Sequence, residues 1–273
     1  MVKLCTLASS YKWADANSEV LLVLADCKVV VYYSPGIVFT DRDLLPATKV
    51  VNMQHEFGRN DVICDFTQTR YTVRRGSDGA VLTFTMGPPY VLMLYTNAAK
   101  GEWDTALRLC RLTKDTTLWT VLCGLAVRGA QLRIAECCYA ALEEVDKLRH
   151  MRHIREIGLP EGQQAEMALF QHRPEEAERI LLQAGLIYRA IRMHIRLYNW
   201  ERALEIACDR RTHIDTVLAF RQKYLESFGK QESQEKFRQI GETIKVDWDV
   251  INTKIKEEKE KEKQKAGGGG GKR

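Results

Sequence analysis

The sequence lacks the short motifs by which most enzymes bind phosphate, activate a nucleophile or hold zinc. It contains no G-x-x-x-x-G-K-[ST], no G-x-S-x-G, no H-E-x-x-H and no G-x-G-x-x-G. The one glycine run, residues 267–271, lies at the C-terminal end and indicates a flexible terminus. We therefore expect no catalytic residues, no cofactor and no metal, and a protein that is not an enzyme.

Long apolar runs and a basic body are also missing. No stretch approaches the roughly 18 apolar residues that cross a bilayer, and the start lacks a secretory signal. We expect an intracellular protein with no direct membrane insertion. Of the formal charge of +5, residues 254–273 carry +4, through eight Lys or Arg against four Glu. A nucleic-acid module shows a basic face on the folded domain itself, so no nucleic-acid partner is expected.

Cysteine pairs with metal-site spacing are absent as well. The eight cysteines form no C-x-x-C and lie in apolar segments, which predicts buried, reduced thiols. A weaker hypothesis is a metal or thiol site that joins His150 and His153 to Cys137 and Cys138. The stretch around the two histidines is more simply interpreted as a basic helix face above apolar residues.

The sequence changes character near residue 90, and the part before it has the pattern of β-structure. Val20–Ala25 and Lys28–Tyr33 are apolar at nearly every position and rich in β-branched residues, which predicts strands buried on both faces. A second set of strands is predicted over Asp61–Phe66, Tyr71–Arg74 and Ala80–Thr85. Strands buried on both faces are typical of propeller blades, which are packed between neighbouring blades.

The β-region is too short for a closed propeller. Roughly 90 residues hold about two repeats of the 40–45-residue blade, and a propeller closes with typically 4–8 blades. Gly87-Pro88-Pro89 then stops the sheet, because proline donates no ladder hydrogen bond. We therefore expect residues 1–90 to be the C-terminal blades of an incomplete propeller, in a chain that is the C-terminal part of a longer protein. Without the missing blades, residues 1–86 are expected to lose order.

From Val91 the pattern becomes helical, and one phrase recurs. Gly101-Glu-Trp-Asp-Thr-Ala-Leu107 reappears as Tyr198-Asn-Trp-Glu-Arg-Ala-Leu204, with Arg173-Pro-Glu-Glu-Ala177 as a weaker relative. A small Ala lets a partner helix approach closely, so the phrase predicts stacked helix pairs, an α-solenoid over residues 91–245. The five tryptophans are expected to be mainly core residues.

Three segments carry clear helix signals. Pro174 and Gly185 bound one helix, and apolar residues recurring from Ile214 to Phe228 predict another with a single buried stripe. Residues 246–273 are predicted as a charged tail, helical at first and then disordered. Within that tail, Asp247 and Asp249 favour a helix start, and Glu257 with Lys261 and Glu260 with Lys263 are expected to pair.

Two places are candidates for partner contacts. Arg149, Arg152 and Arg155, with Lys147, form a basic helix face that would meet an acidic surface or a phosphate, although a solvated face is the simpler interpretation. Trp248 lies at the edge of the compact region, where an exposed aromatic side chain would anchor a partner.

Several longer phrases resemble a known family. They are Tyr71-Thr-Val-Arg-Arg75, Lys100-Gly-Glu-Trp-Asp-Thr-Ala-Leu-Arg-Leu-Cys110, Trp119-Thr-Val-Leu-Cys123, Tyr198-Asn-Trp-Glu-Arg-Ala-Leu-Glu-Ile206 and Trp248-Asp-Val-Ile-Asn-Thr-Lys-Ile255. Over nearly all of residues 1–255, the chain resembles the C-terminal third of a WD-repeat subunit of intraflagellar transport complex B. The first propeller and most of the second propeller of that family have no counterpart in the sequence.

The resemblance implies a fold and a function. The fold is a WD-repeat β-propeller followed by a tetratricopeptide-like α-solenoid. The function is that of a non-enzymatic scaffold for cilium assembly and maintenance, located in the cytoplasm, the cilium and the ciliary basal body. The implied partners are other complex B subunits, and a second copy through the helical region. A coatomer-like vesicle-coat subunit, or a general helical-repeat adaptor, is the alternative, since membrane coats also combine propellers with solenoids.

Overall fold

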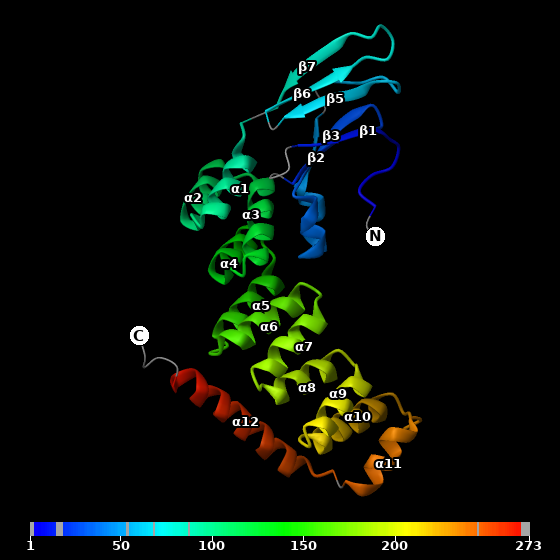
Figure 1. Cartoon of the computed structure of the whole chain (residues 1–273), viewed down its shortest axis with the longest axis vertical. Coiled ribbons are helices and arrows are strands. Elements are labelled where there is room, and N and C mark those ends of the chain that lie inside the picture. The colour runs from blue at the N-terminus through cyan, green and yellow to red at the C-terminus, as the bar shows by residue number, and fades with distance from the viewer. Residues whose placement is uncertain are drawn as a thin grey trace. The chain divides into compact units, whose positions relative to one another are not determined.

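The computed structural model describes residues 3–14, 19–52, 55–67, 69–86, 88–244 and 246–268. The chain divides into two compact units, residues 1–153 and 154–273 (Figure 1). Gly87 of the predicted Gly-Pro-Pro stop lies outside the described residues. None of the described helices is both long enough and apolar enough to span a membrane.

The first unit begins with strands and ends with helices. Its strands are β1 (Ala8–Trp13), β2 (Val20–Ala25), β3 (Lys28–Tyr33), β4 (Lys49–Asn52), β5 (Val62–Thr67), β6 (Arg70–Arg74) and β7 (Val81–Thr85). The 3₁₀ helices η1 (Pro35–Phe39) and η2 (Arg42–Thr48) separate β3 from β4. Its helices are α1 (Tyr90–Lys100), α2 (Trp103–Thr113), α3 (Thr116–Arg128), α4 (Leu132–Ala141) and α5 (Val145–Glu156), of which the end of α5 falls in the second unit.

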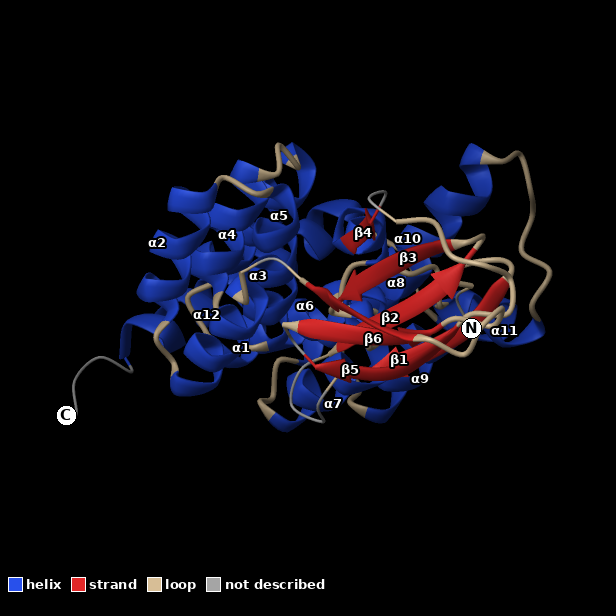
Figure 2. Cartoon of the chain, turned by 90° about the horizontal axis from the view of Figure 1, so that it is seen from above, coloured by secondary structure: helices blue, strands red, loops and turns tan. Residues whose placement is uncertain are grey.

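The strands form two antiparallel sheets with the expected pairing. β2 and β3 have the predicted bounds and pair from Val20 opposite Tyr33 to Ala25 opposite Lys28. Every side chain of β2 is buried, as predicted for a strand covered on both faces. The order of the first sheet is β1-β2-β3-β4, and β5, β6 and β7 make the second sheet. The strands are drawn red and the helices blue in Figure 2. Within the described residues the two sheets stay separate and neither closes into a barrel.

The segment between β3 and β4 packs against helices of the first unit. Ile37 on η1 is fully buried, and a Cβ added to Gly124 of α3 would lie 2.8 Å from Ile37 Cδ1. Asp41, just before η2, accepts hydrogen bonds from Tyr139 Oη and Lys147 Nζ, each at 2.9 Å. Glycine on α3 therefore allows the close approach, and a largely buried carboxylate joins it to α4 and α5.

Every regular element described in the second unit is a helix. Its helices are α6 (Pro160–Phe170), α7 (Pro174–Gln183), α8 (Ile187–Arg196), α9 (Trp200–Asp209), α10 (Ile214–Ser227), α11 (Glu235–Thr243) and α12 (Trp248–Gly268). The bounds of α7 and α10 match the predicted helices, with Gly185 and Gly229 at positive φ just beyond them. In α12, Asp247 Oδ1 accepts from the backbone N–H of Asp249 at 2.9 Å, which confirms the predicted helix start.

The repeated phrase marks the start of a helix each time it occurs. Its alanine is the fourth residue of α2, α7 and α9, and is fully buried in all three. Two further helices, α4 and α8, follow the same rule with Ala135 and Ala190. A methyl side chain at this position leaves room for the neighbouring helix, so the phrase encodes the packing of helix pairs.

The turns between helices share one backbone conformation. Among the described residues, a residue with positive φ lies two positions before the next helix in seven turns. Six of these, all except the turn at Lys114, share a further hydrogen bond: Gly101, Ala130, Glu143, His172, Gly185 and Tyr198. The N–H of the following residue bonds the carbonyl five residues back, as for Asn199 and His194 O at 2.9 Å. This is the Schellman arrangement, in which glycine is the usual residue. Only two of these six turns have it, so most of them carry no glycine signal.

Some sequence expectations on burial were wrong. Phe228, expected in the buried stripe of α10, is 62% exposed, because it follows the last residue of the helix. Trp13 on the sheet-edge strand β1 is 53% exposed, whereas Trp200 is buried as expected. Cys64 is exposed on β5, since alternate side chains of this strand face outward. The free thiols of Cys110, Cys123 and Cys138 are buried as predicted.

Candidate functional site

The basic face predicted on α5 is only partly solvated. Lys147 is largely buried and its Nζ lies 2.9 Å from Asp41 Oδ1 and 3.1 Å from Asp43 Oδ2. Burial lowers the pKa of Lys147, but hydrogen bonds to these two carboxylates outweigh it and raise the pKa overall. The acidic surface that this lysine meets therefore belongs to the chain itself.

The three predicted arginines of α5 have different surroundings. Arg149 is exposed, with Nη1 3.9 Å from Asp146 Oδ1. Arg152 Nε donates to Glu136 Oε1 at 2.7 Å, although its side chain remains more than half exposed. Arg155 is exposed, and its backbone carbonyl accepts a hydrogen bond from Gln163 Nε2 at 3.3 Å. Arg149 and Arg152 thus present charge to solvent, and their role as partner contacts stays a prediction.

Trp248 is partly exposed at the start of α12. Its ring makes an edge-to-face contact with Phe220 of α10, with centroids 5.5 Å apart. Lys223 Nζ lies 5.7 Å from the centroid of the Trp248 ring, within the range of a cation–π interaction. One side of the indole therefore packs on α10, and 38% of the residue remains accessible. This combination suits an anchor, and its use as one stays a prediction.

A charge network joins three successive helices of the second unit. Glu178 on α7 accepts from His194 Nε2 of α8 at 2.8 Å and from Arg202 Nε of α9 at 3.2 Å. The hydrogen bond from Arg202 is the main cause that lowers the pKa of Glu178. Burial lowers the pKa of His194, so the imidazole is neutral at pH 7. The network therefore links α7, α8 and α9 through one largely buried carboxylate.

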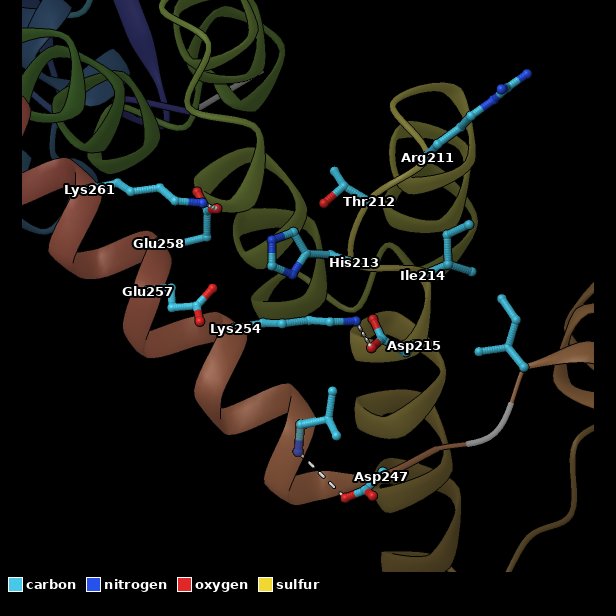
Figure 3. Close-up of a pocket in the computed structure, with 12 residues that line it drawn as sticks. Arg211, Thr212, His213, Ile214, Asp215, Asp247, Lys254, Glu257, Glu258 and Lys261 are labelled. Carbon is cyan, nitrogen blue, oxygen red and sulfur yellow. Dashed lines mark hydrogen bonds and ion pairs between the residues drawn. The ribbon is translucent and has the colours of Figure 1, made fainter.

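A hollow of about 660 Å³ opens between the start of α10 and α12 (Figure 3). His213, almost fully buried, projects toward α12 from the turn before α10, and its Nδ1 lies 3.3 Å from Thr216 Oγ1. Lys254 of α12 donates to Asp215. Burial raises the pKa of Asp215, but the hydrogen bonds from Lys254 and the backbone N–H of Thr216, together with the charge of Lys254, outweigh it and the pKa falls overall. Charges of both signs line the hollow, which suits a polar helix better than an apolar small molecule.

The buried cysteines have unreactive thiols. Burial raises the pKa of Cys110 to about 12, and a hydrogen bond with Cys123 raises the pKa of Cys138. The thiolate is the reactive form of cysteine, so these thiols are poor nucleophiles and poor metal ligands at neutral pH. Among the residues that the structure describes, no group of three or more His, Cys, Asp and Glu side chains is placed to hold a metal ion.

Sequence reasoning missed the features that depend on contacts distant in the chain. No sequence motif marks Glu178, His194 or Asp215, because their hydrogen-bond partners lie 16 to 39 residues away in the chain. The predicted pair of Glu257 with Lys261 is replaced by Glu258, whose Oε1 lies 2.8 Å from Lys261 Nζ. Glu260 and Lys263 approach as predicted, at 3.9 Å.

Comparison with known proteins places both parts of the chain. Residues 118–264 match the profile of the IFT80/172/WDR35/WDR19 TPR domain, and residues 1–90 match the IFT80 second beta-propeller. The predicted order of propeller blades and then tetratricopeptide-like helices is therefore confirmed.

Curated relatives extend over most of the chain. The chain is 40% identical to the intraflagellar transport protein 80 homolog of Rattus norvegicus over 94% of its own length, and 38% identical to that of Mus musculus. It spans about a third of the length of these two relatives. It is also 30% identical to the intraflagellar transport protein 172 homolog of Drosophila melanogaster, over 45% of the chain and 8% of that relative. Since the first profile covers more than half of its residues, the chain belongs to the IFT80/172/WDR35/WDR19 TPR-domain family.

Proposed function

We propose that the chain is a non-enzymatic scaffold that forms part of a subunit of intraflagellar transport complex B and serves cilium assembly and maintenance. The observation that supports this most is the helical frame of stacked pairs, repeated from α2 to α9, in a family whose curated members are named for intraflagellar transport. Helical repeats expose extended surfaces that bind other proteins, so we expect this region to act by binding and not by catalysis.

We further propose how the segments divide this work. Residues 1–90 are blades of an incomplete propeller, residues 91–245 form the solenoid and residues 246–273 form a charged tail. Partners are other complex B subunits, and a second copy through the helical region. Arg149, Arg152, Arg155 and Trp248 supply contacts from accessible side chains. The protein would be found in the cytoplasm, the cilium and the ciliary basal body.

The proposal is tested by affinity purification of the tagged chain from ciliated cells. Intraflagellar transport subunits should co-purify with it, and Trp248→Ala should lower their yield. Trp13→Ala, which removes another exposed tryptophan from β1, is the matched control and should leave the yield unchanged. A chain that stays in the cytosol with no ciliary complex attached would contradict the proposal, and co-purification of vesicle-coat subunits would favour the coat alternative.

A further inference from the structure

Helix α12 lies along other helices of the second unit (Figure 1). Its composition, in contrast, predicts a free, solvated tail. Arg189 Nε of α8 donates to Glu262 Oε2 at 2.8 Å, and Lys254 donates to Asp215 of α10. Near its end, Ala266 lies so close to Gly158 that a Cβ on that glycine would be 2.8 Å from Ala266 Cβ. These contacts run from the second turn of α12 almost to its end.

The inward face of α12 is only partly apolar. Its less exposed residues recur at helical spacing: Ile251, Ile255, Glu258, Glu262 and Ala266. Ile251 is fully buried, but the next positions are only partly covered, and two of them are carboxylates. An amphipathic helix that belongs permanently to a core would carry apolar side chains along this whole stripe. Between the second half of α12 and the other helices, the described contacts are therefore one ion pair, Glu262 with Arg189, and the close approach of Ala266 to Gly158, with little apolar packing.

The surface beneath α12 is poorly filled. Besides the hollow of about 660 Å³ at its first half, a second of about 390 Å³ lies between its second half and the start of α8. Leu186 and Tyr188 line this second hollow, and both are buried with α12 in place. Both hollows are open to solvent beside α12, so the helix covers this surface only in part. If α12 moved away, an apolar floor would be exposed, with Arg189 near one end and Asp215 near the other.

We propose that the surface formed by Leu186, Tyr188, Arg189, His213 and Asp215 is a groove for an amphipathic helix of another protein, and that α12 occupies it as an intramolecular substitute. The charges define the partner helix by the spacing of α12 itself. The partner helix carries an apolar residue at the position that corresponds to Ile251. Three residues after it comes a cation that pairs with Asp215, and eleven residues after it comes a carboxylate that pairs with Arg189. This proposal depends on the proposed scaffold function in one respect: the helix that binds the groove belongs to another subunit.

The test uses the purified full-length chain and a fluorescent peptide with the sequence of residues 247–266. The double variant Lys254→Glu, Glu262→Ala reverses one charge on α12, removes the other and leaves the groove intact. The peptide should bind this loosened chain at least tenfold more tightly than wild type, measured by fluorescence anisotropy. Equal binding to both chains, or no binding to the loosened chain, would overturn the proposal.

Charge reversal in the groove supplies the matched control. Adding Arg189→Glu to the loosened chain should weaken peptide binding at least tenfold, and a peptide with Glu262→Lys should recover most of the loss. Absence of this recovery would contradict the assigned pair. A loosened chain that forms a stable dimer by exchanging α12 would assign the groove to a second copy and overturn the assignment to another protein.

A measurement on the wild-type chain guards against a variant that fails to fold. Backbone amides of residues 255–266 should exchange with deuterium at least tenfold faster than those of α10, because the second half of α12 opens independently. Equal protection would show that α12 is a permanent part of the unit. Both measurements use purified chain and peptide without other subunits, so their failure would leave the proposed transport function standing.

Discussion

Replacing Glu178 with Ala should loosen the second unit more than any nearby surface change, because one carboxylate joins three helices. His194 Nε2 lies 2.8 Å from it and Arg202 contacts both of its oxygens. The variant removes these hydrogen bonds and leaves both donors in place without their acceptor. His194 cannot turn to water, since only 5% of its side chain is exposed.

The expected loss follows from the two donors separately. Leaving the buried imidazole of His194 without its acceptor costs about 1–3 kcal/mol. Losing the charged bond from Arg202 costs about 1 kcal/mol, at the low end for such bonds, because its guanidinium is 43% exposed and regains water. The free energy of opening of the second unit should therefore fall by about 3 kcal/mol.

Native-state hydrogen exchange measures this loss at the helices concerned. At about 1.4 kcal/mol for each factor of ten, slow amides of α8 should exchange roughly 100-fold faster in Glu178→Ala. Glu176→Ala is the matched control on the same helix, since Glu176 makes a surface pair with Arg173. It should change exchange less than about fivefold. Equal effects of the two variants would refute the argument that the Glu178 network holds α7, α8 and α9 together.

Three further predictions address packing, turns and pH. Ala203→Leu should destabilise the second unit by about 1–3 kcal/mol through overpacking of a fully buried position, and an unchanged urea midpoint would count against the packing role of the repeated phrase. Ala130→Gly should stabilise the first unit by about 1 kcal/mol because φ is +52° there; Ala141→Gly at a helix end should do the opposite, and a like sign for both would refute the turn argument. Burial lowers the pKa of His194 and of His213 below 6.5, so unfolding takes up protons and the urea midpoint of the second unit should fall as pH drops from 7 to 5. A midpoint that stays constant over this range would contradict that assignment.

The sequence predicted those elements whose signal is local. β2 and β3 were bounded correctly because burial on both faces makes nearly every residue apolar. α7 and α10 were found from proline, glycine and the apolar stripe. The short edge strands β1 and β4 were missed, because several of their side chains face solvent and show little apolar pattern. The turns that have Ala130 or Tyr198 at positive φ could not be predicted either, because the hydrogen bonds around these residues, and not the residue type, set the conformation.

The candidate site was predicted far less well than the fold. Lys147 was assigned to a solvated face because nothing near it in sequence reveals Asp41 on η2. The packing of α12 was missed for a related reason: a helix rich in Lys and Glu is typical of a solvated tail, and its inward face is visible only beside Arg189 and Asp215. Ion pairs between distant segments leave no periodicity in the sequence, whereas apolar packing does.

The most direct test of the central claim is to image the fluorescently labelled chain in living ciliated cells. The account predicts discrete particles that enter the cilium and move along the axoneme together with a labelled complex B subunit. A chain that remains diffuse in the cytoplasm, without ciliary particles, would contradict the claim that it acts in intraflagellar transport.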